Sequence, residues 1–401
     1  ERQGGGSDAI AKAADLLSKA KFPVILSGAG VVIGGAIEET KKLAEKLEAP
    51  VCSGYQHNDS FPGSHPLAVG PLGYNGSKAA MELISKADVV LALGTRLNPF
   101  STLPGYGIDY WPKNANIIQV DINPDRIGLT KKVTVGISGD AKLVAQQIFD
   151  KLASNAGDAN RQERKDLIHQ TKSAWLQKLS SLDHEEDDQG TVWNKEARER
   201  DKDRMSPRQA WRAIQAGMPD DVIISSDIGN NCAIGNAYPT FEKPRKYLAP
   251  GLFGPCGYGF PSILGAKIGC PNTPVIGFAG DGAFGISMNE MSSCAREEWP
   301  AITMVIFRNY QWGAEKRNTT LWFDNNFIGT ELDPELSYAK VADACGLKGV
   351  TVKTMEETTA AIKQSCEDQK KGITTFIEVI LNQELGAVSY THLRAHETPA
   401  N

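Results

Sequence analysis

Residues 274–282 read Pro-Val-Ile-Gly-Phe-Ala-Gly-Asp-Gly, and residues 302–311 read Ile-Thr-Met-Val-Ile-Phe-Arg-Asn-Tyr-Gln. Each stretch opens with a short apolar run typical of a buried β-strand, and the segment between the two is long enough for a helix. In a parallel α/β sheet both strands would end at the same edge, which is where such folds bind ligands. We therefore expect Asp281 and Asn309 to converge at that edge.

A carboxylate and an amide oxygen together suit a hard cation. Mg²⁺ usually takes only a few protein oxygens and fills its other positions with phosphate oxygens and water. The pair therefore predicts an anchor for a diphosphate rather than a closed metal cage. For Gly280-Asp281-Gly282 alone, an ordinary turn is the alternative, and the flanking strands favour the functional interpretation.

A Gly-Asp-Gly followed about thirty residues later by Asn resembles the signature of thiamine-diphosphate enzymes. The resemblance implies thiamine diphosphate and Mg²⁺ as cofactors. It implies as metal ligands the side chains of Asp281 and Asn309 and the backbone carbonyl of Gln311. Further cofactor contacts are expected from the same two segments, at Gly280, Gly282, Ala283 and Gly313.

Two other segments carry candidate cofactor contacts. A strand pattern at residues 221–227 runs into Gly229-Asn230-Asn231, where backbone N–H groups at a strand-to-helix turn can hold a phosphate. In acetolactate-synthase-like relatives, the loop that corresponds to residues 251–261 places a large apolar side chain beneath the cofactor, and Gly254 and Cys256 occupy that loop here. The alternatives are an unremarkable turn and a buried cysteine that behaves as a small hydrophobe.

Longer stretches at residues 226–239, 248–259 and 307–326 are similar to one group of acyltransferases in this family. The resemblance implies that sulfoacetaldehyde and phosphate are converted to acetyl phosphate and sulfite, as in taurine and sulfonate degradation. Lys316 and Arg317 are the expected contacts for the anionic groups of the substrates, with surface salt bridges as the alternative. Two other hypotheses stay open: an acetolactate synthase or other carboligase or decarboxylase, and a non-catalytic nucleotide-binding or scaffold fragment.

Helical and strand patterns alternate along the chain, which predicts an α/β fold with two doubly wound parallel-sheet domains. The resemblance implies that these are the central and the diphosphate-binding domains of the family. We expect a central domain over residues 1–152, a charged connector over 153–205, the diphosphate- and Mg²⁺-binding domain over 206–386, and a non-native or disordered tail over 387–401.

The glycines at positions 28, 30 and 34 are spaced one residue too widely for a dinucleotide-binding motif. They favour a tight strand-to-helix turn, and no ligand is assigned to them. His57 and His65 flank a loop-like segment and are expected to be ordinary loop histidines, although the corresponding loop in relatives approaches the domain boundary, which gives His57 an alternative place near the active site.

The composition is that of a globular protein, with 401 residues, 41% of them hydrophobic and 23% charged. A net charge of -5 argues against a nucleic-acid partner, and no apolar run approaches the length that spans a membrane. The seven cysteines are scattered and form no Cys-x-x-Cys pair, so we expect reduced thiols in a cytoplasm.

The first residue is Glu rather than Met, so the chain is expected to be the interior of a longer protein. Family members begin with a pyrimidine-binding domain that supplies a glutamate to the cofactor. We therefore expect this chain to be inactive alone. Because the two halves of the family's site come from different subunits, the resemblance also implies a homodimer or homotetramer that holds the cofactor between subunits.

Overall fold

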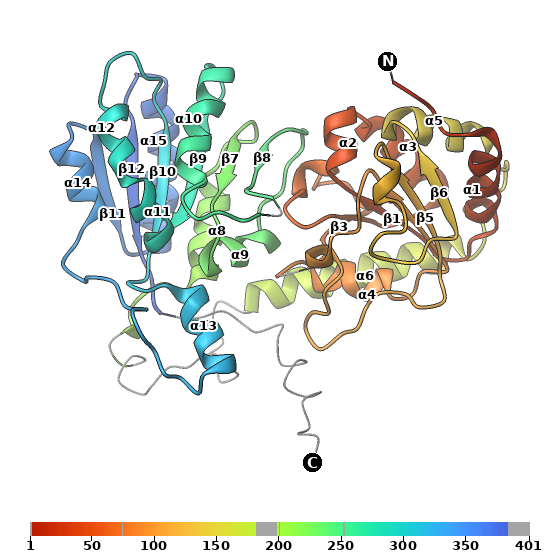
Figure 1. Ribbon diagram of the computed structural model, residues 1–401, viewed down its shortest axis with the longest axis horizontal. Coiled ribbons are helices and arrows are strands. Elements are labelled where there is room, and N and C mark those ends of the chain that lie inside the picture. Colours follow the sequence, from red (N-terminus) through yellow and green to blue (C-terminus); the bar gives the residue numbers. More distant parts are fainter. Residues whose placement is uncertain (1, 74, 182–198, 200, 252, 384–401) are drawn as a thin grey trace. The chain divides into compact units, whose positions relative to one another are not determined.

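The computed structural model describes residues 2–73, 75–181, 199, 201–251 and 253–383. The chain divides into two compact units, which are seen in Figure 1. The first takes in the residues up to Ser181 together with Thr240–Arg245, and the second takes in the remaining described residues. Among the helices of these residues, none is both long enough and apolar enough to cross a bilayer.

A six-stranded sheet forms the centre of the first unit. Its order is β3-β2-β1-β4-β5-β6, and all neighbouring strands run parallel. The inner strands β1 and β4 are buried along their whole length, as expected for a parallel sheet covered on both faces. The strands are β1 (Pro23–Ser27), β2 (Val51–Ser53), β3 (Ala68–Pro71), β4 (Val89–Leu93), β5 (Asn116–Asp121) and β6 (Val135–Ser138).

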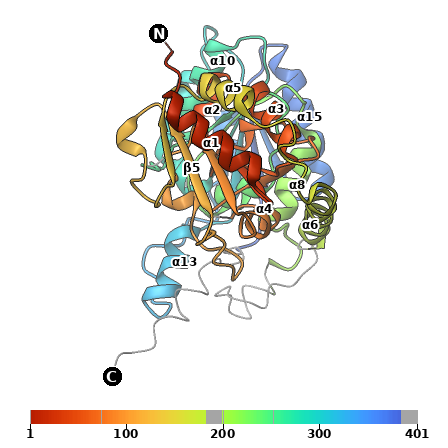
Figure 2. The same cartoon turned by 90° about the vertical axis from the view of Figure 1, so that its right-hand side faces the viewer.

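Helices cover both faces of this sheet. Figure 1 shows α2, α3 and α5 on one side of the strands and α4 and α6 on the other, and Figure 2 shows the same unit after a quarter turn, with α1 in front. α1 and α3 pack on α5, and α4 packs on α6. The helices are α1 (Ser7–Lys19), α2 (Ala29–Gly34), α3 (Ile37–Leu47), α4 (Lys78–Ile84), α5 (Ala141–Lys151) and α6 (Arg161–Ser181), with 3₁₀ turns η1 (Asn58–Ser60), η2 (Pro99–Ser101) and η3 (Pro124–Arg126).

The glycine turn after β1 packs directly on the turn after β4. A Cβ added at Gly28 would lie 2.5 Å from the carbonyl oxygen of Gly94, and one added at Gly30 would lie 2.7 Å from Gly94 Cα. Only glycine allows backbones to approach so closely. This packing accounts for the glycines without a bound nucleotide.

The first part of the predicted connector is a helix that belongs to the first unit. Arg164 of α6 is buried, and its guanidinium donates at 2.7–2.9 Å to the backbone carbonyls of Lys21, Leu47, Glu48, Gly157 and Ala159. The carbonyls of Leu47 and Glu48 lie at the C-terminal end of α3, where a helix leaves acceptors without partners in the helix itself. Residues 182–198 and 200 of the connector, and the whole predicted tail, lie outside the described residues.

His57 and His65 both lie in the first unit. His65 Nε2 is 3.2 Å from Glu45 Oε1, so it is a loop histidine with a local partner. His57 is half-buried at the start of η1, and burial, together with the charge of Arg96, lowers its pKa to about 4.

The second unit is built on another six-stranded parallel sheet, with the order β11-β12-β10-β9-β7-β8. Two doubly wound parallel-sheet domains were predicted, and the structure confirms this fold class. The strands are β7 (Ile223–Ser226), β8 (Tyr247–Leu248), β9 (Val275–Gly280), β10 (Thr303–Arg308), β11 (Lys348–Val352) and β12 (Thr375–Ile380).

The helices of the second unit also form two layers, with α8 packed on α15 and α10 packed on α11. α8 begins with a capping box between Ser206 and Gln209 and with proline in its first turn. The helices are α8 (Pro207–Gly217), α9 (Asn230–Ile234), α10 (Gly259–Gly269), α11 (Asp281–Ser287), α12 (Met291–Cys294), α13 (Gly313–Trp322), α14 (Tyr338–Ala344) and α15 (Met355–Gln369), with 3₁₀ turns η4 (Gly235–Ala237) and η5 (Met288–Glu290).

Candidate functional site

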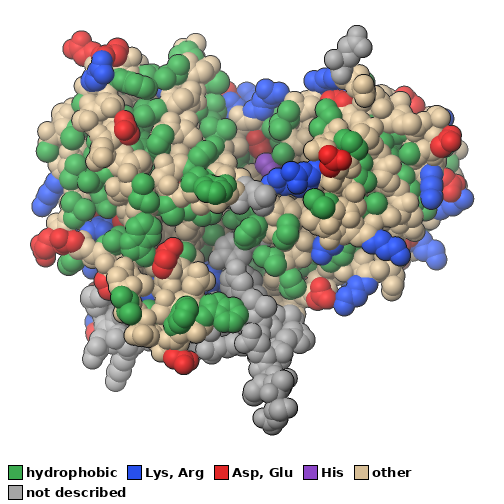
Figure 3. All heavy atoms as spheres, in the orientation of Figure 1, with side chains coloured by type: hydrophobic (Ala, Val, Ile, Leu, Met, Phe, Trp, Pro, Cys, Tyr) green, Lys and Arg blue, Asp and Glu red, His purple; other side chains and the backbone are tan. Residues whose placement is uncertain are grey.

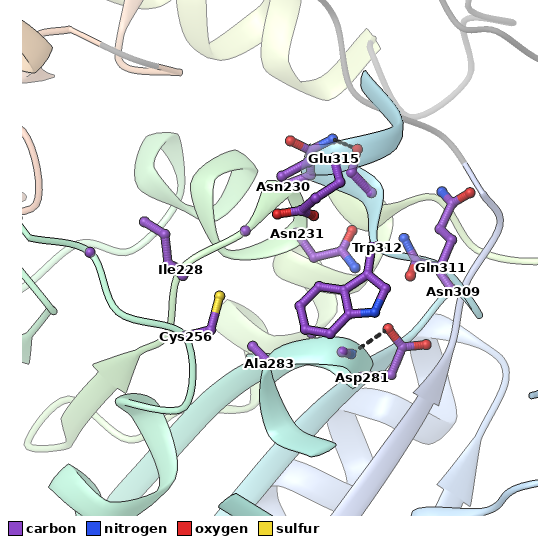
Figure 4. Close-up of a pocket in the computed structure, with 16 residues that line it drawn as sticks. Ile228, Asn230, Asn231, Cys256, Asp281, Ala283, Asn309, Gln311, Trp312 and Glu315 are labelled. Atoms are coloured by element: carbon purple, nitrogen blue, oxygen red, sulfur yellow. Dashed lines mark hydrogen bonds between the residues drawn. The ribbon is translucent and has the colours of Figure 1, made fainter. Parts of the chain in front are cut away.

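Three neighbouring strands of the second unit end at one cavity. β7, β9 and β10 lie side by side in the sheet, and the residues that follow their carboxyl ends line a cavity of about 190 Å³ (Figure 4). Gly280 is level with Phe307 in the register, so Asp281 and Arg308 leave the sheet as neighbours. The expected convergence of Asp281 and Asn309 at the edge of the sheet is confirmed, because both line this cavity.

The cavity brings together every residue that the sequence predicted to contact the cofactor. Their role in binding it remains a prediction. They are Gly229, Asn230, Asn231, Gly254, Cys256, Gly280, Asp281, Gly282, Ala283, Asn309, Gln311 and Gly313, and they share the lining with Ile228, Trp312, Ala314 and Glu315.

Three helices begin at the wall of the cavity. α9 begins after Gly229, whose φ of 116° is a conformation that only glycine adopts without strain. α11 begins at Asp281 and α13 at Gly313, and Asn230 Nδ2 donates to the Gly313 carbonyl at 3.1 Å, which ties α9 to α13. Backbone N–H groups at such helix starts have no partner within the helix and can bind the oxygens of a phosphate.

One oxygen of Asp281 is held by the protein, and the other lies toward the cavity. Asp281 Oδ2 accepts from Tyr310 N at 2.7 Å and from Arg308 Nη1 at 3.0 Å, whereas Oδ1 accepts from its neighbour Gly282 N at 3.0 Å. Burial raises the pKa of this carboxyl to about 6, although the charge of Arg308 opposes the shift. The carboxylate is therefore poorly solvated and would gain stability from a cation beside Oδ1.

Asn309 faces two other oxygens. One terminal atom of its side-chain amide lies 3.2 Å from the Gln311 carbonyl and 3.3 Å from Asp281 Oδ1, and it donates to both when it is the nitrogen. When it is the oxygen, it is repelled by both acceptors unless a cation lies between them. Adjacent ligands of an octahedral Mg²⁺ are roughly 3 Å apart, so the spacings from the Asn309 amide to Asp281 Oδ1 and to the Gln311 carbonyl suit ligands of one ion.

The turn after β10 explains why Gln311 presents its backbone rather than its side chain. Tyr310 has a φ of 62°, in the left-handed region, and its carbonyl accepts from Leu332 N at 2.9 Å. The Gln311 side chain is occupied elsewhere, because Nε2 donates to the Gln383 carbonyl at 2.9 Å. Its own carbonyl is thereby left facing Asn309.

The wall opposite the metal ligands is apolar. Figure 4 shows Ile228 beside Cys256, with the sulfur directed into the cavity. Burial raises the pKa of the Cys256 thiol, and Asp227 and Glu315 raise it further, so the side chain is an uncharged contact. The Trp312 ring covers Gly282, where an added Cβ would lie 2.8 Å from it.

Lys316 and Arg317 do not line the cavity. Lys316 forms an ion pair with Glu331, and its ammonium lies 5.2 Å from the centre of the Phe327 ring. Arg317 is buried, and the neighbour that reaches the cavity is Glu315. The charged side chains among the lining residues, Asp281 and Glu315, are therefore both acidic. A diphosphate would need a cation between itself and Asp281.

Asp227 was not predicted from the sequence as a functional residue, although it holds a loop that lines the cavity. Its oxygens accept from the backbone N–H groups of Ile228 at 2.8 Å, Gly257 at 3.1 Å and Gly259 at 2.6 Å. These bonds hold the loop that carries Cys256 against the end of β7. The sequence does carry a signal for Asp227, because this residue ends a strand-like run just as Asp281 does.

Two family comparisons cover most of the chain. The central domain of thiamine pyrophosphate enzymes matches residues 10–148, and the C-terminal thiamine pyrophosphate-binding domain of these enzymes matches residues 227–379. Thiamine pyrophosphate is another name for thiamine diphosphate. The second match contains every residue that lines the cavity, since the lining runs from Ile228 to Glu315.

Similar proteins carry two kinds of name, sulfoacetaldehyde acetyltransferase and acetolactate synthase. A probable sulfoacetaldehyde acetyltransferase of Rhizobium meliloti (strain 1021) is 79% identical over 96% of this chain and 65% of its own length. The sulfoacetaldehyde acetyltransferase of Roseovarius nubinhibens is 71% identical over 96% of this chain and 64% of its own. A probable acetolactate synthase large subunit of Methanococcus aeolicus is 30% identical over 89% of this chain and 58% of its own.

A solved structure has the same fold. The benzoylformate decarboxylase of Polynucleobacter necessarius superposes with a TM-score of 0.72 at 20% identity, over 96% of this chain and 66% of that one. The chain spans slightly less than two thirds of the length of the acetyltransferases that it matches. From the two domain matches and these relatives, the chain belongs to the thiamine pyrophosphate enzymes, of which it contains the central domain and the C-terminal cofactor-binding domain.

Proposed function

We propose that the protein converts sulfoacetaldehyde and phosphate to acetyl phosphate and sulfite, with thiamine diphosphate and Mg²⁺ in the cavity at the ends of β7, β9 and β10. The observation that carries the proposal is the set of three oxygens from Asp281, Asn309 and Gln311 beside a wall of helix starts. The choice of substrate rests on the relatives named sulfoacetaldehyde acetyltransferase, which are far more similar to this chain than the one named acetolactate synthase.

The proposed reaction needs no oxidant or reductant. The carbon–sulfur bond breaks and sulfite leaves with its electron pair. The aldehyde carbon loses its hydrogen as a proton and forms a new bond to a phosphate oxygen, while the former methylene carbon gains a proton and becomes the methyl group. Sulfoacetaldehyde and hydrogen phosphate give acetyl phosphate and hydrogen sulfite with all atoms and charges conserved. Thiamine diphosphate, when bound, supplies a nucleophilic carbon and an electron sink for such chemistry.

The metal ligands and the helix starts have separate tasks in this proposal. Asp281, Asn309 and the Gln311 carbonyl would hold Mg²⁺ through three oxygens, which leaves its remaining positions for phosphate oxygens and water. The backbone N–H groups that follow Gly229 and Gly313 would donate to the diphosphate. The acidic cavity makes the cation necessary, because no basic side chain lines it among the described residues.

The apolar wall would set the position of the rest of the cofactor. Ile228 and Cys256 lie together on the side away from Asp281, and their side chains exclude water from that region. A cysteine is smaller than the apolar side chain that acetolactate-synthase-like relatives place beneath the cofactor. We infer that Ile228 supplies part of the contact that Cys256 is too small to make.

Lys316 and Arg317 remain the proposed contacts for the sulfonate and the phosphate. Both lie on α13, whose first turn forms part of the cavity wall. The proposal requires Lys316 to exchange Glu331 for a substrate anion. It also requires the substrates to approach from the side of α13.

A homo-oligomer with the cofactor at the subunit interface is also proposed. α13 and the residues after it carry exposed apolar side chains, with Trp322 54% exposed, Phe323 67% and Ile328 79%. Figure 3 shows hydrophobic side chains on the surface of this part of the second unit, as on the rest of the same face. Exposed apolar surface of this kind is typical of a protein–protein contact.

A cytoplasmic location is proposed from the state of the cysteines. All seven carry free thiols, and Cys52, Cys232, Cys294 and Cys366 are buried. Reduced thiols fit a reducing compartment.

The test is the formation of sulfite and acetyl phosphate by the full-length protein, supplied with sulfoacetaldehyde, phosphate, thiamine diphosphate and Mg²⁺. Both products are expected, and Asp281→Ala is expected to abolish them because it removes the charged metal ligand. Absence of both products, with acetolactate formed from pyruvate by the same preparation, would overturn the substrate and keep the cofactor. Absence of cofactor binding would favour a non-catalytic fragment.

A further inference from the structure

Arg308 is the last residue of β10 and immediately precedes the proposed metal ligand Asn309. Its side chain is only 1% exposed, so its charge depends on protein partners. The guanidinium donates through Nη1 to Asp281 Oδ2 at 3.0 Å and lies with Nε 3.6 Å from Glu378 Oε1. It also stacks on the Tyr310 ring, with its central carbon 4.2 Å from the ring centre.

The bond to Asp281 decides which oxygen faces the cavity. Arg308 and the Tyr310 N–H both donate to Oδ2, from the side of the sheet. A carboxylate held at one oxygen by two donors cannot rotate freely, and its other oxygen is directed toward the Asn309 amide. Groups that orient a metal ligand in this way commonly strengthen metal binding.

The other end of the guanidinium holds a different segment. Arg308 Nη2 donates to the backbone carbonyls of Asp333 at 2.5 Å and Leu336 at 2.9 Å. Glu378 holds the same segment from the opposite side, because its carboxylate accepts from Ser337 Oγ at 2.7 Å and from the Tyr338 N–H at 3.2 Å. The segment from Asp333 to Tyr338 is thus fixed beside Asp281, whose own carbonyl accepts from the Tyr338 hydroxyl at 2.9 Å.

This segment closes the lobe that carries α13, here residues 312–330. At the base of the lobe, Trp312 N donates to the Thr330 carbonyl at 2.8 Å and Leu332 N donates to the Tyr310 carbonyl at 2.9 Å. Gln311 and Glu331 form an antiparallel bridge between these bonds. The lobe begins directly after the proposed metal ligand Gln311 and ends shortly before the segment that Arg308 holds.

We propose that Arg308 is a positioning residue that orients Asp281 toward the cation and, through the same guanidinium, couples metal binding to the fixing of the segment at the base of the α13 lobe. The inference rests on the proposed Mg²⁺ site. A cation at Asp281 Oδ1 would favour the rotamer that Arg308 stabilises, and that rotamer keeps the guanidinium in reach of Asp333 and Leu336. Loading the site and fixing the base of the lobe therefore stabilise each other.

Arginine suits this role because its planar fork donates in several directions at once. A lysine at position 308 could pair with Asp281 Oδ2 or donate to a carbonyl of the segment, but a single ammonium cannot reproduce the fork. Glutamine would lose the charge as well. The three side chains therefore form a graded series at one buried position.

The test measures Mg²⁺ affinity by calorimetry in the presence of thiamine diphosphate, using the full-length protein and its Arg308→Gln and Arg308→Lys variants. We expect Arg308→Gln to weaken Mg²⁺ binding by roughly 10- to 100-fold, and Arg308→Lys to weaken it less. Excess Mg²⁺ should restore thiamine diphosphate binding in both variants, which separates a positioning role from loss of the fold.

Arg164→Lys is the matched control, because Arg164 is as buried as Arg308 but donates only to carbonyls of the first unit. It should lower the melting temperature and leave Mg²⁺ affinity unchanged. Limited proteolysis gives the second readout: Mg²⁺ with thiamine diphosphate should protect residues 312–336 in the wild type and protect them much less in Arg308→Gln.

The outcomes separate this inference from the site on which it rests. A wild-type protein that binds neither Mg²⁺ nor thiamine diphosphate would overturn both the site and the role of Arg308. A wild type that binds them, with an Arg308→Gln variant of equal Mg²⁺ affinity, would overturn the role of Arg308 alone. Equal protection of the lobe in the two proteins would overturn the coupling.

Discussion

The residues of the site differ in how far the sequence could predict their placement. Asp281 and Asn309 each follow an apolar run, and the edge of a parallel sheet brings the ends of such runs together, so both were predicted to meet. Lys316 and Arg317 were predicted only from their position after the metal ligands, which gives no direction. The helical turn that begins at Gly313 leads Lys316 to Glu331 and leaves Glu315 at the cavity.

The lowered pKa of His57 predicts how the stability of the protein depends on pH. Its pKa is lowered from 6.5 to about 4, first by burial and then by Arg96, so the folded state favours the neutral ring. Protonation of His57 therefore favours unfolding. Its neutral ring contributes fully to the free energy of unfolding above pH 6.5, and this contribution is lost as the pH falls toward 4. In urea unfolding, the wild type should lose more stability across this range than His57→Gln. A difference between the two proteins that stays constant with pH would contradict this.

At the scale of the element, the long apolar strands were predictable and the ends of several helices were not. The runs that form β1, β4 and β10 are buried throughout, and β9 is buried except at Gly280, so their composition alone indicates them. α14 begins only at Tyr338, although Pro334 would suit the first turn of a helix. The carbonyls of Asp333 and Leu336 are held by Arg308, a partner distant in sequence that local patterns do not reveal.

Arg164 attaches α6 to the rest of the first unit, and its substitution tests how much this attachment stabilises the unit. Arg164→Gln would leave buried carbonyls at the end of α3 short of donors, and the first unit should lose about 3 kcal/mol of unfolding free energy. Arg161→Gln is the control, because Arg161 is more exposed and forms an ion pair with Glu48 and bonds to two carbonyls. It should cost about 1 kcal/mol or less in the same urea titration. Equal losses in the two variants would show that Arg164 has no special role.

At the scale of the whole molecule, the two parallel sheets were predictable because helix and strand patterns alternate through both halves of the chain. Most of the cavity lining was predictable because its residues follow three neighbouring strands, whereas Gly254 and Cys256, in the loop after β8, were expected there from the family resemblance. The substrate was not derivable from these patterns, because carboligases and acyltransferases can share one cofactor site on one fold. Its assignment depends on the similarity of long stretches to named relatives.

The central claim is that Asp281, Asn309 and the Gln311 carbonyl hold a divalent cation beside the diphosphate of the cofactor. A crystal structure of the full-length protein grown with thiamine diphosphate and Mn²⁺, with anomalous data collected for manganese, tests it most directly. We predict one strong anomalous peak within about 2.3 Å of Asp281 Oδ1, the Asn309 side-chain oxygen and the Gln311 carbonyl, with diphosphate oxygens completing the coordination. Bound cofactor with the metal peak elsewhere, or with the Asn309 amide donating to Asp281 and Gln311, would contradict the account.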